Sequence, residues 1–223
     1  LAGSANAQLW GIKTIPEDYA TVTAAVTALN SAGVGAGGVT FNVAAGHTEN
    51  TTAEILITAT GTSDNQIVFQ KSGLGVNPKI TRTDANVNST TVLGALGDAV
   101  IRMNSTDYIT FDGIDVAATQ STIEYGYFTF KTATNGCKYV TIKNCNITMT
   151  KGAYVIGINI SNGPTSTSSA TGVTVTTEPG ANNNIIITGN TIQNVHAGIY
   201  LRGATGYYDY NYTIGASGAG NTI

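Results

Sequence analysis

Apolar and polar residues alternate along a segment that the chain writes three times. The copies start at Tyr108, Tyr139 and Asn184, and the first reads Tyr-Ile-Thr-Phe-Asp-Gly-Ile-Asp-Val. In each copy the alternation lasts four residues, a Gly or Asn interrupts it, and a short apolar pair follows. This pattern predicts a strand, a sharp bend and a second strand. Its repetition predicts a parallel β-solenoid.

A second set of apolar strands is expected at 99–103, 127–131, 155–160 and 198–202, and earlier strands at 39–43, 54–58, 66–70 and 79–83. Side chains alternate in direction along a strand, so inward residues of successive coils should stack. The second set predicts stacks of Ile101, Phe128, Ile158 and Ile199, and of Met103, Phe130, Ile160 and Leu201. The repeated segment predicts stacks of Ile109, Val140 and Ile185, and of Phe111, Ile142 and Ile187.

Asparagines gather at or near the bend, at Asn144, Asn146 and Asn190. A buried ladder of side-chain amides that satisfies successive turns would place them there. Ordinary exposed turn asparagines would give the same pattern. Both interpretations stay open.

An amphipathic pattern over residues 18–30 predicts a single helix, with Asp18 capping its first turn. Glycines within 33–38 should end the helix and form a flexible connection. A lone amphipathic helix before a stack of strands is expected to cover the open hydrophobic end of the solenoid.

The residues around this helix carry a resemblance. The chain has Asp18-Tyr-Ala-Thr-Val before the helix and Val43-Ala-Ala-Gly-His-Thr-Glu49 after the Gly-rich turn and strand. This order resembles the opening of secreted right-handed parallel β-helix proteins of the pectate-lyase and pectin-esterase kind, a pattern shared by many bacterial surface proteins. The resemblance extends weakly through the later repeats, and it implies an all-β, right-handed parallel β-helix with an N-terminal α-helical cap.

The domain organisation follows from these elements. Residues 1–7 contain Ser4-Ala-Asn-Ala, a small-x-small pattern that fits the tail of a secretory signal or a plain N-terminal arm. Residues 8–38 are expected to hold an arm and the capping helix, and residues 39–223 the coils. The insertion at 163–181 should protrude as a loop. Because residue 223 lies in what reads as a further strand, we expect the native chain to continue or another copy to cover that end.

Composition points to an extracellular setting. Charged residues make up 10% of the 223 residues, hydrophobic residues 42%, and the net charge is −3. Such a surface suits long stacked sheets and secretion, and it offers no electrostatic attraction to nucleic acid. No apolar run is long enough to span a bilayer. The expected location is therefore secreted or cell-surface, and the expected partners are other copies of the chain, through open ends, or polysaccharide.

The two cysteines, Cys137 and Cys145, frame one predicted strand. An extended strand holds their sulfurs about 25 Å apart, too far for a disulfide. Buried free thiols are the preferred interpretation over a redox or metal role.

Basic residues mark one candidate ligand-binding face, on the outward positions of the second strand set. Arg102, Lys131 and Arg202 could engage uronate carboxylates there, with Tyr200 in the same rows. A solvated sheet face with scattered charges gives the same pattern. Arg202 would be the first candidate base of a lyase.

A tyrosine cluster at 207–212 is the second candidate. Alternation would place Tyr208, Tyr210 and Tyr212 on one side of the chain. Exposed rings there would stack on sugars or anchor a protein interface, and inward rings would fill a widened last coil.

Catalytic chemistry has little support. Asp112 and Asp115 straddle the bend of the first copy, but Lys143 and Asn146, then Thr188 and Thr191, replace them in the later copies. No acidic pair of the kind that glycosidases use builds up across coils. The Asn-Thr-Asp, Asp-Asp, Gly-His-Gly and Arg-Ile-Lys motifs of the pectin-cleaving hydrolases are absent. The only histidines, His47 and His196, fit turns better than metal ligands, and no metal or cofactor is expected.

The sequence therefore favours a structural or adhesive β-helix module that assembles end to end or into a filament. Two alternatives stay open. One is a polysaccharide lyase or glycoside hydrolase acting on the face of Arg102, Lys131 and Arg202. The other is non-catalytic glycan binding by the tyrosines.

Overall fold

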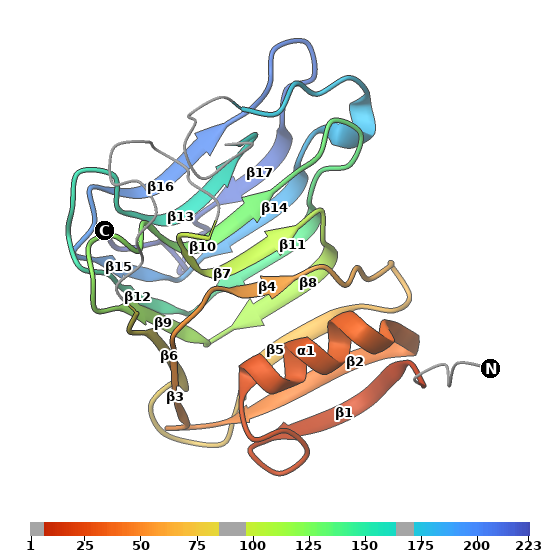
Figure 1. Cartoon of the computed structure of the whole chain (residues 1–223), viewed down its shortest axis with the longest axis vertical. Coiled ribbons are helices and arrows are strands. Elements are labelled where there is room, and N and C mark those ends of the chain that lie inside the picture. Colours follow the sequence, from red (N-terminus) through yellow and green to blue (C-terminus); the bar gives the residue numbers. More distant parts are fainter. Residues whose placement is uncertain (1–6, 85–96, 164–171) are drawn as a thin grey trace.

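Strands follow one another in triplets, and each triplet adds one strand to each of three parallel sheets (Figure 1). The computed structural model describes residues 7–84, 97–163 and 172–223. We name the sheets A, B and C in the order in which the chain visits them. Three parallel sheets built from repeating triplets are the architecture of a right-handed parallel β-helix, as the repeated segment predicts.

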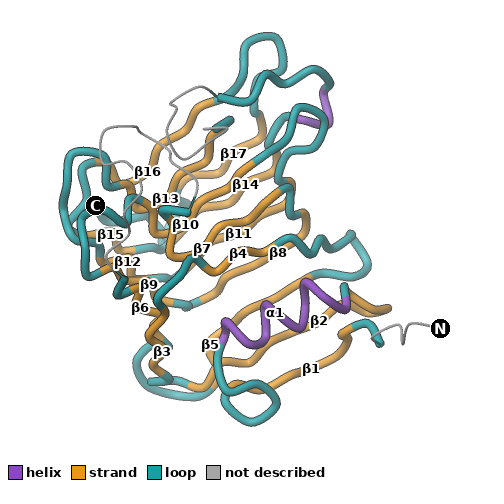
Figure 2. The backbone as a smooth tube through the Cα atoms, in the orientation of Figure 1, coloured by secondary structure: helices purple, strands orange, loops and turns teal. Residues whose placement is uncertain are grey.

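The backbone tube in Figure 2 shows these strands stacked coil upon coil. Sheet A contains β1 (Leu9–Ile15), β2 (Val34–Ala44), β5 (Ile67–Ser72), β8 (Asp107–Asp112), β11 (Lys138–Lys143), β14 (Asn183–Thr188) and β17 (Tyr210–Ile214). Sheet B contains β3 (Thr48–Thr51), β6 (Lys79–Arg82), β9 (Asp115–Ala118), β12 (Asn146–Thr148) and β15 (Thr191–Gln193). Sheet C contains β4 (Ile55–Ile57), β7 (Ala99–Asn104), β10 (Tyr125–Phe130), β13 (Ile156–Ser161) and β16 (Ala197–Arg202). Each copy of the repeated segment forms a sheet A strand and the sheet B strand after it, as predicted.

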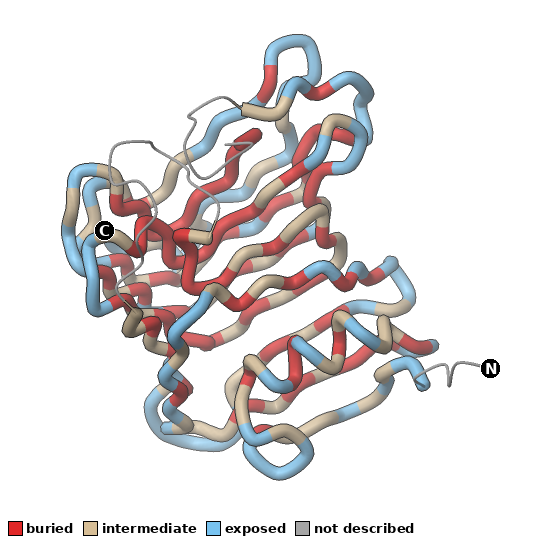
Figure 3. The backbone as a smooth tube through the Cα atoms, viewed as in Figure 1, coloured by how far each residue is buried: buried red, intermediate tan, exposed pale blue. Residues whose placement is uncertain are grey.

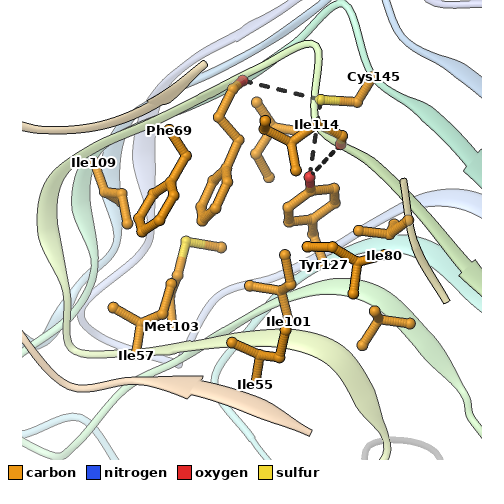
Figure 4. Close-up of a cluster of buried hydrophobic side chains, with 14 of the residues drawn as sticks. Ile55, Ile57, Phe69, Ile80, Ile101, Met103, Ile109, Ile114, Tyr127 and Cys145 are labelled. Atoms are coloured by element: carbon orange, nitrogen blue, oxygen red, sulfur yellow. Dashed lines mark hydrogen bonds between the residues drawn. The ribbon is translucent and has the colours of Figure 1, made fainter. Parts of the chain in front are cut away.

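One apolar core fills the space between the sheets, and Figure 3 shows buried positions along the strands and exposed positions in the connecting loops. Phe41, Phe69 and Phe111 stack on successive strands of sheet A, with ring centroids 4.5 Å and 5.5 Å apart. Such offset stacking stabilises aromatic pairs beyond the area they bury. Figure 4 shows the core beside them, where the Tyr127 hydroxyl donates to the Ile114 carbonyl oxygen at 2.6 Å.

The one α-helix among the described residues, α1 (Val22–Ala32), begins four residues later than predicted. Thr21 is its N-cap and accepts a hydrogen bond from the Ala24 backbone N–H at 3.0 Å. Asp18 instead accepts from the Thr14 backbone N–H at 2.7 Å, which closes the preceding turn. The buried face of α1 joins the core and packs against β1, β2 and β4, so the helix covers the first coil as expected. No helix in the described ranges is both long and apolar enough to cross a membrane.

Glu49 joins the two parts of the N-terminal motif, the residues before α1 and the residues after β2. Its carboxylate is buried and accepts hydrogen bonds from the first free N–H groups of α1, Val22 at 2.8 Å and Thr23 at 3.1 Å. A carboxylate at a helix N-terminus satisfies these donors and complements the helix dipole. The segment after β2 therefore caps the helix that follows the first segment, so this motif has a structural role.

The N-terminal region differs from expectation in two places. Leu9–Ile15 forms β1, a strand paired in parallel with β2, where an arm was expected. The glycine-rich stretch at 33–38 is largely strand, because β2 starts at Val34, and the expected flexible connection is wrong. Gly38 has φ +76°, and a Cβ there would lie 2.5 Å from the Gln66 carbonyl oxygen, so close packing on β5 requires glycine. Residues 1–6 of the expected signal remnant and 164–171 of the expected loop lie outside the described residues.

The predicted inward stacks are confirmed for sheet A and are wrong at β10. Tyr127 pairs with Ile101, and Phe128 pairs with Arg102, so the strand lies one residue out of the expected phase. Tyr127 and Thr129 consequently face the core, while Phe128 faces outward. Both faces of β10 are apolar, and alternation defines no phase where neither face is polar. The same shift turns the predicted inward Phe130 outward, beside Asn104.

Side-chain ladders build the turn from sheet A into sheet B. Buried Asn190 accepts from the Cys145 backbone N–H at 3.0 Å and donates to the Ile142 carbonyl oxygen at 2.9 Å. One coil later, Asn221 accepts from the Asn190 backbone N–H at 3.1 Å. The buried ladder is therefore confirmed for Asn190. Asn144, at φ +58°, is an ordinary turn residue, and the exposed Asn146 bonds to Asp115.

Both cysteines are free and buried, as predicted. Cys137 and Cys145 each donate a backbone N–H to an asparagine of the next coil. Burial raises the pKa of each thiol to about 12. At neutral pH they are protonated packing groups.

Candidate functional site

The predicted basic face of sheet C is largely neutralised by ion pairs. Arg102 lies with its Nε 2.6 Å from Glu54 Oε1, and its guanidinium lies over the Phe130 ring at 5.7 Å. Lys131 is fully buried, with Nζ 2.5 Å from Asp209 Oδ1, and the expected outward, solvent-facing position is wrong. The one-residue shift of β10 and the pairing with Asp209 explain the difference.

Aromatic side chains occupy the outer row of sheet C between the expected basic residues. Phe128 and Tyr125 are fully buried there, with half-buried Tyr200 packed beside them. Of the three predicted basic residues, only Arg202 is exposed. Ligand binding by Tyr200 and Arg202 stays a prediction.

The tyrosine cluster divides between core and surface, so the expected common side is wrong. Tyr212 pairs with Ile185, packs against the core, and donates its hydroxyl to Asp209 Oδ2 at 2.9 Å. Burial, and then the Asp209 carboxylate, raises the pKa of Tyr212 far above its ordinary value. Tyr208 is 71% exposed, and Tyr210 is exposed beside Glu178. Contacts of these two with a ligand stay a prediction.

Asp209 holds this region together. Besides Lys131 and Tyr212, it accepts from the Asn182 backbone N–H at 2.9 Å. Asn182 in turn accepts from the Cys137 backbone N–H at 2.8 Å. This second corner ladder flanks sheet A opposite the Asn190 ladder. The two ladders therefore lie at the two ends of the sheet A strands.

A groove of about 530 Å³ lies on sheet A, and of the predicted ligand-binding residues only Tyr212 lines it. We call it the sheet A groove. Ten residues line it: Gln66, Tyr108, Thr110, Tyr139, Thr141, Asn184, Ile186, Asn211, Tyr212 and Thr213. None of them is charged.

One wall of the groove is a row of residues with left-handed backbone. Tyr108, Tyr139, Asn184 and Asn211 are the second residues of β8, β11 and β14 and of β17, and each has a φ of +51° to +57°. The register places them side by side on neighbouring strands. Left-handed non-glycine residues are uncommon, and four in one row form a built feature. We call this row the ridge.

Side chains along the ridge contact one another. The rings of Tyr108 and Tyr139 stack with centroids 4.3 Å apart and planes 13° apart, and Tyr139 is 45% exposed. Asn211 donates to Asn184 at 3.4 Å. Desolvation, and then the neighbouring Tyr139, raises the pKa of Tyr108, so its phenol stays protonated above the ordinary value of 10.0.

The floor of the groove is the outward row of sheet A. Thr110, Thr141, Ile186 and Thr213 pair in register across β8, β11, β14 and β17. Hydroxyls and amides beside apolar surface can exchange hydrogen bonds with a neutral, hydroxyl-rich molecule. The described residues hold no group of three or more His, Cys, Asp or Glu side chains arranged to bind a metal ion.

The two carboxylates of the first bend are engaged in local contacts. Asp112 Oδ2 lies 3.1 Å from Lys143 Nζ. Asp115 is buried and accepts from Asn77 at 2.7 Å and from the Asn146 backbone N–H at 2.7 Å. Both side chains hold the turn between sheets A and B.

Three of the four ridge residues are recognisable in the sequence as equivalent positions of the repeat. Tyr108, Tyr139 and Asn184 are the first residues of the three copies of the repeated segment. The repeat therefore predicts that these three residues lie at the same position on successive coils. Their left-handed backbone and the ring contact depend on neighbouring coils, which a single strand pattern does not contain.

Comparisons with known proteins give one structural likeness. No protein-family model matches the chain, and no curated protein matches it in sequence. The catalytic domain of a GH87 alpha-1,3-glucanase in complex with nigerose superposes with a TM-score of 0.43 at 16% identity, over 95% of this chain. The chain covers 34% of that protein's length. The fold assignment rests on the chain's own three sheets.

Proposed function

We propose that this chain is a secreted or cell-surface adhesive module of pectate-lyase-like kind that binds a neutral polysaccharide in the sheet A groove without cleaving it. The observation that carries the proposal is the groove lining, which combines a tyrosine and asparagine ridge with a threonine and isoleucine floor and has no charged residue.

Sugar rings present apolar C–H faces and a rim of hydroxyls. Tyr139 offers a partly exposed aromatic surface, and Asn184 and Thr141 offer an amide and a hydroxyl within the same groove. The stacked pair of Tyr108 and Tyr139 is ordered before any ligand binds, which lowers the entropy cost of binding.

Charge favours a neutral ligand over a uronate polymer. A carboxylate-rich chain would need cations to offset the loss of water around its charges, and the groove lining contains none. The alternative of a lyase or hydrolase on sheet C relied on three free cations. Arg102 and Lys131 are engaged by Glu54 and Asp209. End-to-end assembly of copies stays a prediction, for which sedimentation of the purified chain is the measurement.

Binding assays on two sets of polymers test the proposal. Isothermal titration with neutral xylans, mannans and glucans, and with pectin and alginate as acidic probes, should give binding to a neutral polymer. Tyr139→Ala should weaken that binding about tenfold, equivalent to about 1.4 kcal/mol. Incubation with the same polymer should release no unsaturated or reducing-end product.

Tyr208→Ala is the matched control, because Tyr208 is an exposed tyrosine outside the groove. It should leave the affinity unchanged. If Tyr208→Ala weakens binding and Tyr139→Ala does not, the tyrosine cluster binds the ligand and the groove proposal is wrong. Binding restricted to the acidic polymers, or cleavage of the bound polymer, would also overturn it.

A further inference from the structure

The outward row that forms the groove floor continues beyond the groove to the other edge of sheet A. Ile12 pairs with Thr40, Thr40 with Val68, and Val68 with Thr110. The complete row crosses all seven strands: Ile12, Thr40, Val68, Thr110, Thr141, Ile186 and Thr213. No charge interrupts it. At the usual strand spacing of about 4.8 Å, this track is roughly 29 Å long, the length of several sugar rings.

The ridge position also recurs on the earlier strands. Gln66 on the approach to β5 is the equivalent of Tyr108, because Ile67 pairs with Ile109. Gly38 is the equivalent on β2, because Val39 pairs with Ile67, and it places no side chain on the ridge. On β1 the register shifts at this point, because Leu9 pairs with Val34 and Gly11 with Val39. Trp10 lies within this irregularity, beside Gly35, and so stands outside the regular ridge row.

Trp10 and Ile12 are the large apolar side chains of β1 that remain in water. They are 67% and 68% exposed, whereas Ile15 at the end of the same strand is fully buried. Tryptophan provides a large ring face for stacking and an N–H donor. These two residues therefore offer an aromatic and aliphatic platform at the far end of the track.

The other border of the track is polar and largely self-satisfied. Gln70 donates to Asn42 at 2.9 Å, and Lys143 pairs with Asp112 at 3.1 Å. This border lies parallel to the ridge, since Asn42, Gln70, Asp112 and Lys143 pair in register on neighbouring strands. The uncharged row thus runs between two polar margins, the usual layout of a binding surface with a polar rim.

We propose that one extended polysaccharide chain lies across all seven strands of sheet A, perpendicular to them, with Trp10 and Ile12 binding the segment beyond β2. This inference rests on the proposed function and extends it from a groove to a polymer track. It names an unbranched neutral polymer, bound along its length, as the ligand. A short oligosaccharide would fill only the part between Gln66 and Thr213.

A length series tests the track. The neutral polymer that binds in the assay of xylans, mannans and glucans is prepared as oligosaccharides from disaccharide to octasaccharide. Their affinities are measured by isothermal titration. For the unaltered chain the affinity should rise with length until the ligand reaches β1. Trp10→Ala should weaken octasaccharide binding about tenfold and leave disaccharide binding unchanged, whereas Tyr139→Ala should weaken binding at every length.

Leu74→Ala is the control, because Leu74 is fully exposed in the turn after β5 and outside both rows. It should change no affinity. Ile12→Asn serves as a second track variant and should also weaken only the long ligands. Unchanged octasaccharide affinity in both Trp10→Ala and Ile12→Asn would overturn the track while leaving the groove in place. Unchanged affinity in Tyr139→Ala would overturn the proposed function itself.

Discussion

At the residue scale, the two cysteines show how burial changes an ionisable group. Cys137 and Cys145 lie at the two corners of sheet A, each beneath an asparagine of the next coil. Desolvation is the main cause that raises each pKa from 9.0 to about 12. Hydrogen bonds to each thiol lower its pKa, but by less than the loss of water raises it.

This shift predicts a loss of stability in alkali. The folded pKa is raised, so the unfolded chain loses its thiol protons first, and stability is intact below about pH 9 and falls as the pH rises towards about 12. Each thiol contributes up to about 1.4 kcal/mol per pH unit in that window. Urea unfolding of Cys145→Ala should therefore show a shallower decline with pH than the unaltered chain. Equal slopes would contradict the assigned burial.

The tyrosines show that nearness in the sequence does not predict contact in this fold. Tyr208, Tyr210 and Tyr212 lie close together in sequence, yet Tyr212 faces the core and Tyr208 faces water. Tyr108 and Tyr139 lie far apart in sequence and stack. The common side predicted for neighbouring tyrosines is wrong, because in a solenoid each residue contacts its equivalent one coil away.

At the element scale, the corner ladder supports the turns that join sheets A and B. Asn190 satisfies the backbone N–H of Cys145 and the carbonyl of Ile142, both in the coil before it. Removing its amide leaves two buried backbone groups without partners. Each unsatisfied group costs about 1–3 kcal/mol.

Asn190→Ala should consequently lower the free energy of unfolding by about 2–6 kcal/mol in urea denaturation. Asn50→Ala in β3 is the control, since Asn50 is exposed, and it should change stability by less than about 0.5 kcal/mol. If the two variants lose equal stability, the buried ladder does not carry the turn.

Element prediction succeeded wherever one face of a strand is polar. In β8 and β11 the polar Thr110, Thr141, Asp112 and Lys143 lie on the outer face, and the predicted inward stacks are confirmed. In β10 both faces are apolar, and the predicted inward residues are wrong by one position. The predicted start of α1 was wrong because Asp18 and Thr21 are both good caps. In the fold Asp18 closes the preceding turn, Thr21 caps the helix, and Glu49 accepts from the Val22 and Thr23 N–H groups.

At the scale of the whole molecule, low charge shapes the proposed binding. The groove lining is uncharged, and desolvation raises the pKa of Tyr108, so that phenol stays neutral through its ordinary range. Binding of the neutral polymer should therefore change by less than about twofold from about 0.05 to 1 M salt, and from about pH 5 to 9. Isothermal titration across these conditions is the measurement. A steep loss of affinity in salt would instead point to Arg202 and the sheet C face.

Sequence patterns are enough to predict the β-helix class, the covering helix, the stacks of sheet A and the buried thiols. These features follow from local alternation, capping and repetition, which act within one coil and recur in the next. The folded arrangement was needed to pair Arg102 with Glu54 and Lys131 with Asp209, and to align the ridge from Tyr108 to Asn211. Those features depend on which coils become neighbours and in what register, and strand periodicity within one coil does not specify either.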